Sequence, residues 1–217
     1  MDIPARKKLL FIGDSITDCD REKPVGEGLF GALGNGYVSI VDAFLQASYP
    51  ELGIRVVNKG LSGNTVRDLS ERWEIDVMEQ QPDWLVIMIG INDVWRQFDS
   101  PFITEKHVYL DEYERTLNRL IEETKSKGTK IVLMTPFFIE TNSNDAMRAA
   151  MDRYGKAVVR LALAHQLTYV DSQAAFNAVL EHTHPTFLAW DRIHPGATGH
   201  TVLAKAFLNS IGFDWNK

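Results

Sequence analysis

The sequence predicts an α/β fold: a three-layer, flavodoxin-like α/β/α domain built on a five-stranded parallel sheet. Short apolar runs alternate along the chain with segments of helical periodicity, and the runs are mostly continuous rather than alternating in polarity. Continuous apolar runs are typical of strands that helices cover on both faces. The alternation of strands and helices indicates βαβ crossovers, which make neighbouring strands parallel.

The expected elements follow in chain order: strand Leu9–Gly13, helix Tyr37–Ser48, strand Ile54–Asn58, helix Thr65–Glu79, strand Trp84–Gly90, helix Leu110–Lys127, strand Lys130–Thr135, helix Asp145–His165, strand Leu167–Asp171 and helix Ala197–Ile211. The first helix ends before Pro50, which cannot donate a helical hydrogen bond. The third helix carries Tyr113, Leu117 and Ile121 on one face, and Gly128 follows it as a typical helix-ending residue.

Length and composition predict one domain over residues 1–217. The chain has 217 residues, of which 45% are hydrophobic and 24% charged, close to average globular usage. This apolar content is too high for a mainly disordered chain. A domain of this size buries enough surface to fold without a disulfide or a structural metal.

Charge and cysteine content exclude several classes of protein. With 29 acidic and 23 basic residues and a pI of about 5.5, the chain has no basic footprint for nucleic acid. Cys19 is the only cysteine, so neither an internal disulfide nor a cysteine-rich zinc site is expected. Asp14 interrupts the first apolar run before a signal peptide can form, and no run reaches the ~20 residues of a membrane span. We therefore expect a cytoplasmic protein without a membrane partner.

Polar and glycine residues gather where the predicted strands end. The first strand ends at Gly13-Asp14-Ser15, and the second leads into Gly60–Gly63. The third ends at Gly90-Ile-Asn92-Asp93, and Asp191–His194 precedes the final helix. Open parallel sheets bind ligands beyond the carboxyl ends of their strands. We therefore expect the chemistry of this chain at that edge.

These residue types supply the parts of a serine hydrolase. Ser15 needs a base to become a nucleophile, and His194 is the leading candidate, with Asp191 three residues earlier to fix its tautomer. The amides of Ser15 and Gly63 and the side chain of Asn92 could stabilise an oxyanion. Each motif alone is more simply explained as a helix cap or a turn. Their combination at one edge favours catalysis.

The four motifs resemble the four blocks of the SGNH, or GDSL, hydrolase superfamily: Gly13-Asp14-Ser15, Gly60-x-x-Gly63, Gly90-x-Asn92-Asp93 and Asp191-x-x-His194. They occur in the family's order and span nearly the whole chain. One departure is Ile16, where the family has leucine. The resemblance implies the SGNH hydrolase fold, Ser15 as nucleophile, His194 as base, Asp191 as its partner, and Ser15, Gly63 and Asn92 as oxyanion donors.

A closer resemblance, to bacterial intracellular acetylxylan esterases, rests on whole segments: LLFIGDSITDC, GIRVVNKGLSGNTVRDL, IMIGINDVWRQ, KHVYLDEY and LAWDRIHP. It implies deacetylation of xylose units in short xylo-oligosaccharides. It also implies a homo-oligomer, with an octamer as the assembly it suggests.

Substrate contacts are expected from Trp190, Trp95 and Asp14, which adjoin the catalytic motifs. The tryptophans could stack on a sugar ring or could only support their catalytic loops. The segment Phe98–Leu110 is long for a connection between a strand and a helix, and both a lid and a subunit interface fit it.

No cofactor or metal is expected. The Gly26-x-Gly28-x-x-Gly31 motif does not follow a strand directly, as a dinucleotide site requires. Asp14, Asp18 and Asp20 lack the further ligands of an octahedral metal site. Two rival functions stay open: a lysophospholipase or acyl-thioesterase, and a non-catalytic carbohydrate-binding module.

Overall fold

The computed structural model describes residues 1–217 and confirms the predicted architecture. The five strands form one sheet in the order β2-β1-β3-β4-β5, and every neighbouring pair is parallel. The strands are β1 (Lys8–Gly13), β2 (Arg55–Asn58), β3 (Trp84–Met88), β4 (Lys130–Met134) and β5 (Thr168–Val170). Their ends lie within two residues of the predicted ones.

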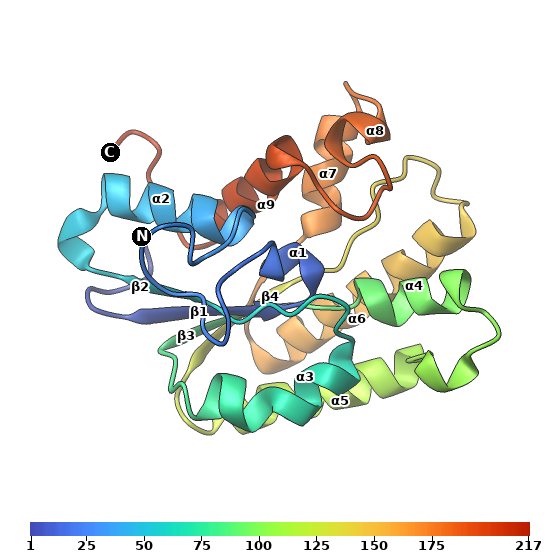
Figure 1. Ribbon diagram of the computed structural model, residues 1–217, viewed down its shortest axis with the longest axis horizontal. Coiled ribbons are helices and arrows are strands. Elements are labelled where there is room, and N and C mark those ends of the chain that lie inside the picture. The colour runs from blue at the N-terminus through green and yellow to red at the C-terminus, as the bar shows by residue number, and fades with distance from the viewer.

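Helices cover both faces of the sheet, which is why the strands are continuously apolar. The helices are α1 (Ser15–Asp18), α2 (Tyr37–Ser48), α3 (Val66–Trp73), α4 (Ile91–Asp99), α5 (Leu110–Lys125), α6 (Ala146–His165), α7 (Ser172–Leu180), α8 (Pro185–Leu188) and α9 (Ala197–Ser210). Short 3-10 turns lie at Pro50–Leu52 and Thr104–Lys106. Helices α2, α7 and α9 pack on one face, and α3, α5 and α6 pack on the other (Figure 1).

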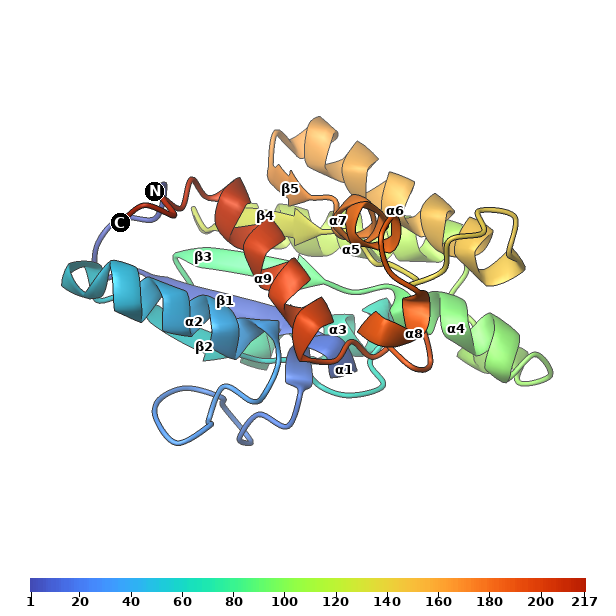
Figure 2. The same cartoon turned by 90° about the horizontal axis from the view of Figure 1, so that it is seen from above.

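A single cluster of 59 buried hydrophobic residues forms the core. The central strands β1 and β3 contribute most of their side chains to it. Seen from above, α2 and α9 lie over the strands, whereas the segment between α1 and α2 extends away from the sheet (Figure 2). No helix is both long enough and apolar enough to cross a membrane.

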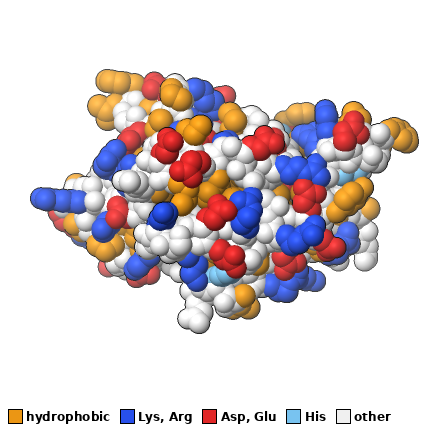
Figure 3. Space-filling view, turned by 90° about the horizontal axis from the view of Figure 1, so that it is seen from below, with side chains coloured by type: hydrophobic (Ala, Val, Ile, Leu, Met, Phe, Trp, Pro, Cys, Tyr) orange, Lys and Arg blue, Asp and Glu red, His pale blue; other side chains and the backbone are white.

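Basic and acidic side chains intermingle on the face formed by α3 and α5, where neither sign of charge dominates (Figure 3). One ion pair, Arg67 with Glu112, joins these two helices, and another, Arg119 with Glu123, lies within α5. Exposed pairs of this kind contribute roughly 0–1 kcal/mol each. The buried faces of the helices therefore hold the layers together.

Several parts of the chain differ from the prediction. The expected helix Thr65–Glu79 is α-helical only to Trp73 and continues as a π-helical turn over Glu74–Met78. Helix α4 begins directly after Gly90, where a turn was expected, and occupies the start of the segment Phe98–Leu110. Helix α7 was not predicted, nor were the four-residue helices α1 and α8. Helices α4 and α7 are each nine residues long, too short to show a clear apolar period.

Candidate active site

The predicted site residues lie at the carboxyl edge of the sheet. Strand β1 ends at Gly13, and Ser15 is the first residue of α1. The loop after β2 carries Gly63, and the first turn of α4, after β3, carries Asn92. Asp191 and His194 lie in the loop between α8 and α9. Because parallel strands all end at one edge, residues far apart in the sequence meet there.

Ser15, His194 and Asp191 form a continuous chain of hydrogen bonds. Ser15 Oγ lies 3.0 Å from His194 Nε2, and His194 Nδ1 lies 2.6 Å from Asp191 Oδ2. Asp191 Oδ1 accepts the backbone amides of Ile193 and His194, each at 2.9 Å. The carboxylate therefore holds both the imidazole and the loop that carries it.

The partners of His194 define its tautomer. Burial alone would raise the pKa of Asp191, but hydrogen bonds from the His194 side chain and from the amides of His194 and Ile193 hold that pKa below its usual value. An ionised carboxylate only accepts, so Nδ1 must carry the proton. In the neutral imidazole, Nε2 is then an acceptor that faces the Ser15 hydroxyl. This arrangement suits the removal of the Ser15 proton.

The loop after β2 presents Gly63 beside Asn92. Gly63 has φ +84°, a backbone conformation that is strained for residues with a side chain. No protein atom lies within contact distance of the place where a Cβ atom would be. Asn92 is buried, and its Nδ2 donates to the carbonyl of Asn64 at 3.0 Å. The second hydrogen on Nδ2 stays free for another acceptor.

Arg96 orients the Asn92 amide. Arg96 Nη2 donates to Asn92 Oδ1 at 3.0 Å, one helical turn along α4. Because a guanidinium only donates, the oxygen of Asn92 must face Arg96 and its nitrogen must face Asn64. The sequence analysis did not assign this role. The spacing of four residues would have indicated it, had α4 been predicted.

Two further side chains brace the loop from other elements. Asp18 Oδ2, on α1, accepts both the amide (3.0 Å) and the hydroxyl (2.8 Å) of Ser62. Arg72, on α3, donates to Asn64 Oδ1 at 2.7 Å and to the carbonyl of Gly13 at 3.1 Å. Neither residue lies in one of the four motifs. Asp18 meets Ser62, and Arg72 meets Gly13, only because the fold brings together residues that are distant in sequence.

The three predicted substrate contacts differ in exposure. Asp14 is 1% exposed, and its Oδ1 accepts the amide of Ile16, so it caps α1. Burial raises the pKa of Asp14 to about 7. Trp95 packs edge-to-face on His194 with ring centroids 5.9 Å apart, whereas Trp190 is 83% exposed. The structure therefore presents Trp190 to solvent, sets Trp95 against the base, and encloses Asp14.

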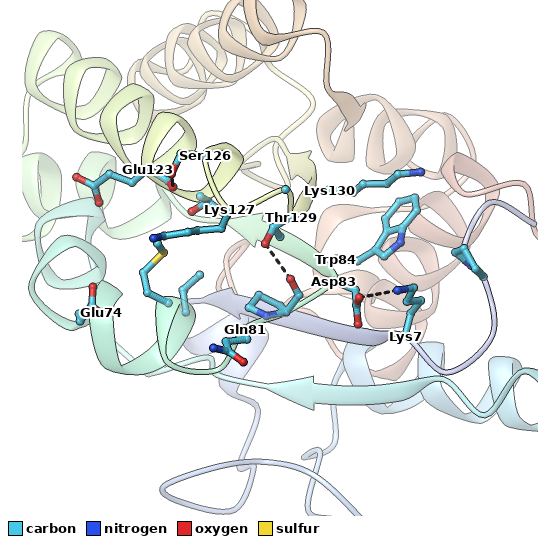
Figure 4. A pocket seen from close by; sticks show the side chains of 16 residues that line it. Lys7, Glu74, Gln81, Asp83, Trp84, Glu123, Ser126, Lys127, Thr129 and Lys130 are labelled. Atoms are coloured by element: carbon cyan, nitrogen blue, oxygen red, sulfur yellow. Dashed lines mark hydrogen bonds and ion pairs between the residues drawn. The ribbon is translucent and has the colours of Figure 1, made fainter.

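One cavity lies away from these residues. It has a volume of about 800 Å³ and opens near the amino ends of β3 and β4, beside Trp84 and Lys130 (Figure 4). Lys7 pairs with Asp83 on its wall at 2.8 Å. Ser15 and His194 are absent from its lining. No group of three or more His, Cys, Asp or Glu side chains in the chain could hold a metal ion.

Comparison with known proteins places the chain in a family. Residues 11–202 match the GDSL-like Lipase/Acylhydrolase family. The chain belongs to this family. The predicted membership of the SGNH, or GDSL, superfamily is thereby confirmed, and so is the prediction of a carboxylic ester hydrolase.

Two proteins with solved structures resemble the chain closely. It is 63% identical to Axe2, an acetylxylan esterase from Geobacillus stearothermophilus, over 99% of this chain and 98% of that one, with a TM-score of 0.98. It is 53% identical to LAE5, an alpha/beta hydrolase from the metagenome of Lake Arreo, with a TM-score of 0.96 and 98% of both chains covered.

Solved structures of Axe2 include catalytic mutants with the substitutions S15A, H194A and D191A. The residue types and numbers are those of Ser15, His194 and Asp191 in this member of the GDSL-like family. Axe2, whose R55A and W190I variants also have solved structures, is described there as an acetyl-xylooligosaccharide esterase.

Proposed function

We propose that the chain is a serine esterase that removes acetyl groups from acetylated xylo-oligosaccharides through a Ser15–His194–Asp191 triad. The observation that carries the proposal is the hydrogen-bonded path from Ser15 Oγ through the imidazole to Asp191. The 63% identity to an acetylxylan esterase over nearly the whole chain supports the substrate.

The reaction takes two half-steps. Ser15 Oγ attacks the acetyl carbonyl while His194 Nε2 accepts the serine proton, and a tetrahedral intermediate forms. The amides of Ser15 and Gly63 and the free N–H of Asn92 stabilise its oxyanion. His194 then gives the proton to the departing sugar oxygen, which leaves an acetyl-serine. Water then attacks this ester while His194 accepts a proton from it, and a second tetrahedral intermediate forms. When this intermediate collapses, His194 returns the proton to Ser15 Oγ and acetate is released.

The binding roles of the three remaining residues follow from their exposure. Trp190, at 83% exposed, is free to stack on the apolar face of a sugar ring. Trp95 supports His194 by edge-to-face packing and can reach substrate from that position. Asp14 is enclosed, so we assign it an indirect effect on binding, through the placement of Ser15.

The two rivals make different demands on the chain. A carbohydrate-binding module without activity needs no triad, yet Ser15 and His194 are in hydrogen-bond contact. A lysophospholipase or thioesterase gains roughly 0.8 kcal/mol per methylene that its acyl groove buries. An acetyl-specific pocket excludes long chains by overlap, so rate and chain length vary in opposite directions in the two cases.

The test follows acetate release from acetylated xylo-oligosaccharides by NMR, beside a series of aryl esters from acetyl to octanoyl. We expect the acetyl ester to react fastest, with a steep fall by butyryl. Octanoyl turnover equal to acetyl turnover would support the lipase-like rival. Absence of acetate from the sugar esters would contradict the proposed substrate.

We further propose that residues 1–217 act as one domain in a cytoplasmic homo-oligomer, with an octamer as the assembly the resemblance suggests. One sheet and one core cluster support the single domain. Exposed apolar side chains such as Phe30 and Phe102 support self-association, and a free Cys19 suits a reducing compartment. Sedimentation velocity of the purified chain tests the assembly, and a monomer at all concentrations would contradict it.

A further inference from the structure

Asp93 is a buried carboxyl group that the proposed mechanism does not use. It follows Asn92 in the first turn of α4 and is 0% exposed. Its Oδ1 accepts the amide of Val66, the first residue of α3, at 3.0 Å. Its Oδ2 is fully buried and has no hydrogen-bond partner. A buried polar atom of this kind requires an explanation, because it costs stability without a visible return.

The bond to Val66 closes a clamp around the oxyanion loop. Asn92 Nδ2 binds the carbonyl of Asn64, and Asp93 Oδ1 binds the amide of Val66, two residues further on. Two adjacent residues of α4 thus form hydrogen bonds with the residues on both sides of Thr65. Gly63, the proposed oxyanion donor, immediately precedes this hydrogen-bonded segment.

We propose that Asp93 is a positioning residue of the esterase: by holding the Val66 amide it fixes the Gly63–Asn64 turn against Asn92 and keeps the oxyanion hole in shape. This inference rests on the proposed function of Gly63 and Asn92 as oxyanion donors. Asp93 should affect the stability of the transition state and not the binding of substrate. Donors that are poorly positioned stabilise the oxyanion less, whereas the neutral substrate binds as before.

Asp93 is expected to accept the Val66 hydrogen bond as a neutral carboxylic acid. Burial, with a smaller contribution from the nearby Asp14 and Asp68 charges, outweighs the backbone hydrogen bonds and raises the pKa of Asp93 to about 8. An asparagine reproduces the shape of a neutral carboxylic acid and keeps an acceptor oxygen for Val66. Asp93→Asn therefore serves as the matched control, and Asp93→Ala removes the acceptor.

The experiment compares kcat and KM of the full chain for an aryl acetate, with melting temperature as a second reading. We expect Asp93→Ala to lower kcat about 10- to 100-fold with KM within about threefold, less than the loss of a whole oxyanion donor. Asp93→Asn should retain kcat within about threefold. A kcat of Asp93→Ala near wild type, a change confined to KM, or an Asn variant as slow as the Ala variant would each overturn the inference.

Changing the donor of this hydrogen bond, the Val66 amide, gives an independent test if Asp93→Ala does not fold. Val66→Pro deletes the amide hydrogen at the first position of α3, where proline is tolerated, and the extended backbone of Thr65 already suits a following proline. Val66→Ala keeps the amide and controls for lost packing. We expect the proline variant to lose kcat as Asp93→Ala does, and the alanine variant to keep it. Equal kcat in the two Val66 variants would overturn the inference.

Ser15→Ala, measured alongside, separates the two proposals. A Ser15→Ala variant with substantial activity would contradict the proposed function itself. Full inactivation of Ser15→Ala together with unaffected Asp93 and Val66 variants would contradict only the positioning role.

Discussion

Arg96 fixes the direction of the Asn92 side chain: its Nη2 donates to Asn92 Oδ1 at 3.0 Å and leaves Nδ2 to face Asn64. The same guanidinium lies 4.5 Å from the centroid of the Trp95 ring, and that ring packs on His194. One cation therefore contacts both the proposed oxyanion donor Asn92 and the ring that packs on the base.

Removal of this cation should weaken catalysis through Asn92. We predict that Arg96→Met lowers kcat about tenfold, less than the ~10²-fold or greater loss from Asn92→Ala, because the amide is misoriented rather than absent. In the Asn92→Ala background, Arg96→Met should cost little more, since both changes act on one group. Steady-state kinetics of the four proteins provide the measurement.

Asp99→Asn is the matched control for Arg96. It removes the ion pair between Arg96 and Asp99 but leaves the bond from Arg96 to Asn92 in place. Its kcat should stay within about twofold of wild type, because an exposed ion pair contributes little. A loss equal to that of Arg96→Met would show that the ion pair, not the orientation of Asn92, matters.

The nucleophile and base should behave as one unit. Ser15→Ala and His194→Ala should each lower kcat by roughly 10⁴-fold or more, and the double variant little further. Mass spectrometry after treatment with a fluorophosphonate should find the label on Ser15 in the wild type. Labelling elsewhere, or a tenth of wild-type activity in Ser15→Ala, would refute the triad.

Stability should fall as the pH rises through neutrality. Burial raises the pKa of Asp93 to about 8 and that of Asp14 to about 7, against 3.8 for an isolated aspartate. Between about pH 4 and pH 8 the unfolded chain has lost protons that the folded chain keeps. By linkage, the stabilising contribution is full below pH 4 and is lost as the pH passes the folded values.

Urea unfolding at pH 5.5 and pH 8.5 tests this expectation. The free energy of unfolding should drop between the two pH values in the wild type, and Asp93→Asn should show a smaller drop, because an amide does not titrate. Groups that do not interact with Asp93 contribute equally to both proteins, so the difference between the two drops reports on Asp93 and on its interaction with the Asp14 and Asp68 charges. Equal drops would show that Asp93 does not titrate in this range.

The sequence predicts the sheet well because continuous apolar runs and their helical neighbours are local signals. The same holds for Ser15 and His194, whose motifs adjoin strand or helix ends. The support that Asp18 gives to the oxyanion loop could not be predicted, since Asp18 reaches Ser62 across the fold. Arg72 reaches Asn64 only after the loop and α3 have folded, and no sequence motif marks that contact. Arg96 was missed for a different reason: its role depends on α4, a helix whose first residues, Asn92 and Asp93, are typical of turns.

Substitution of Trp190 distinguishes between stacking on the sugar ring and support of the catalytic loop. At 83% exposed it has little protein contact to lose, so its replacement should act on substrate rather than on the fold. We predict that Trp190→Ala lowers kcat/KM for an acetylated xylo-oligosaccharide about tenfold, the upper range for one aromatic contact, and leaves a small aryl acetate within about twofold. Trp190→Phe, which keeps an aromatic face, should recover part of the sugar activity. An equal loss on both substrates would assign Trp190 to the support of the Asp191–His194 loop instead.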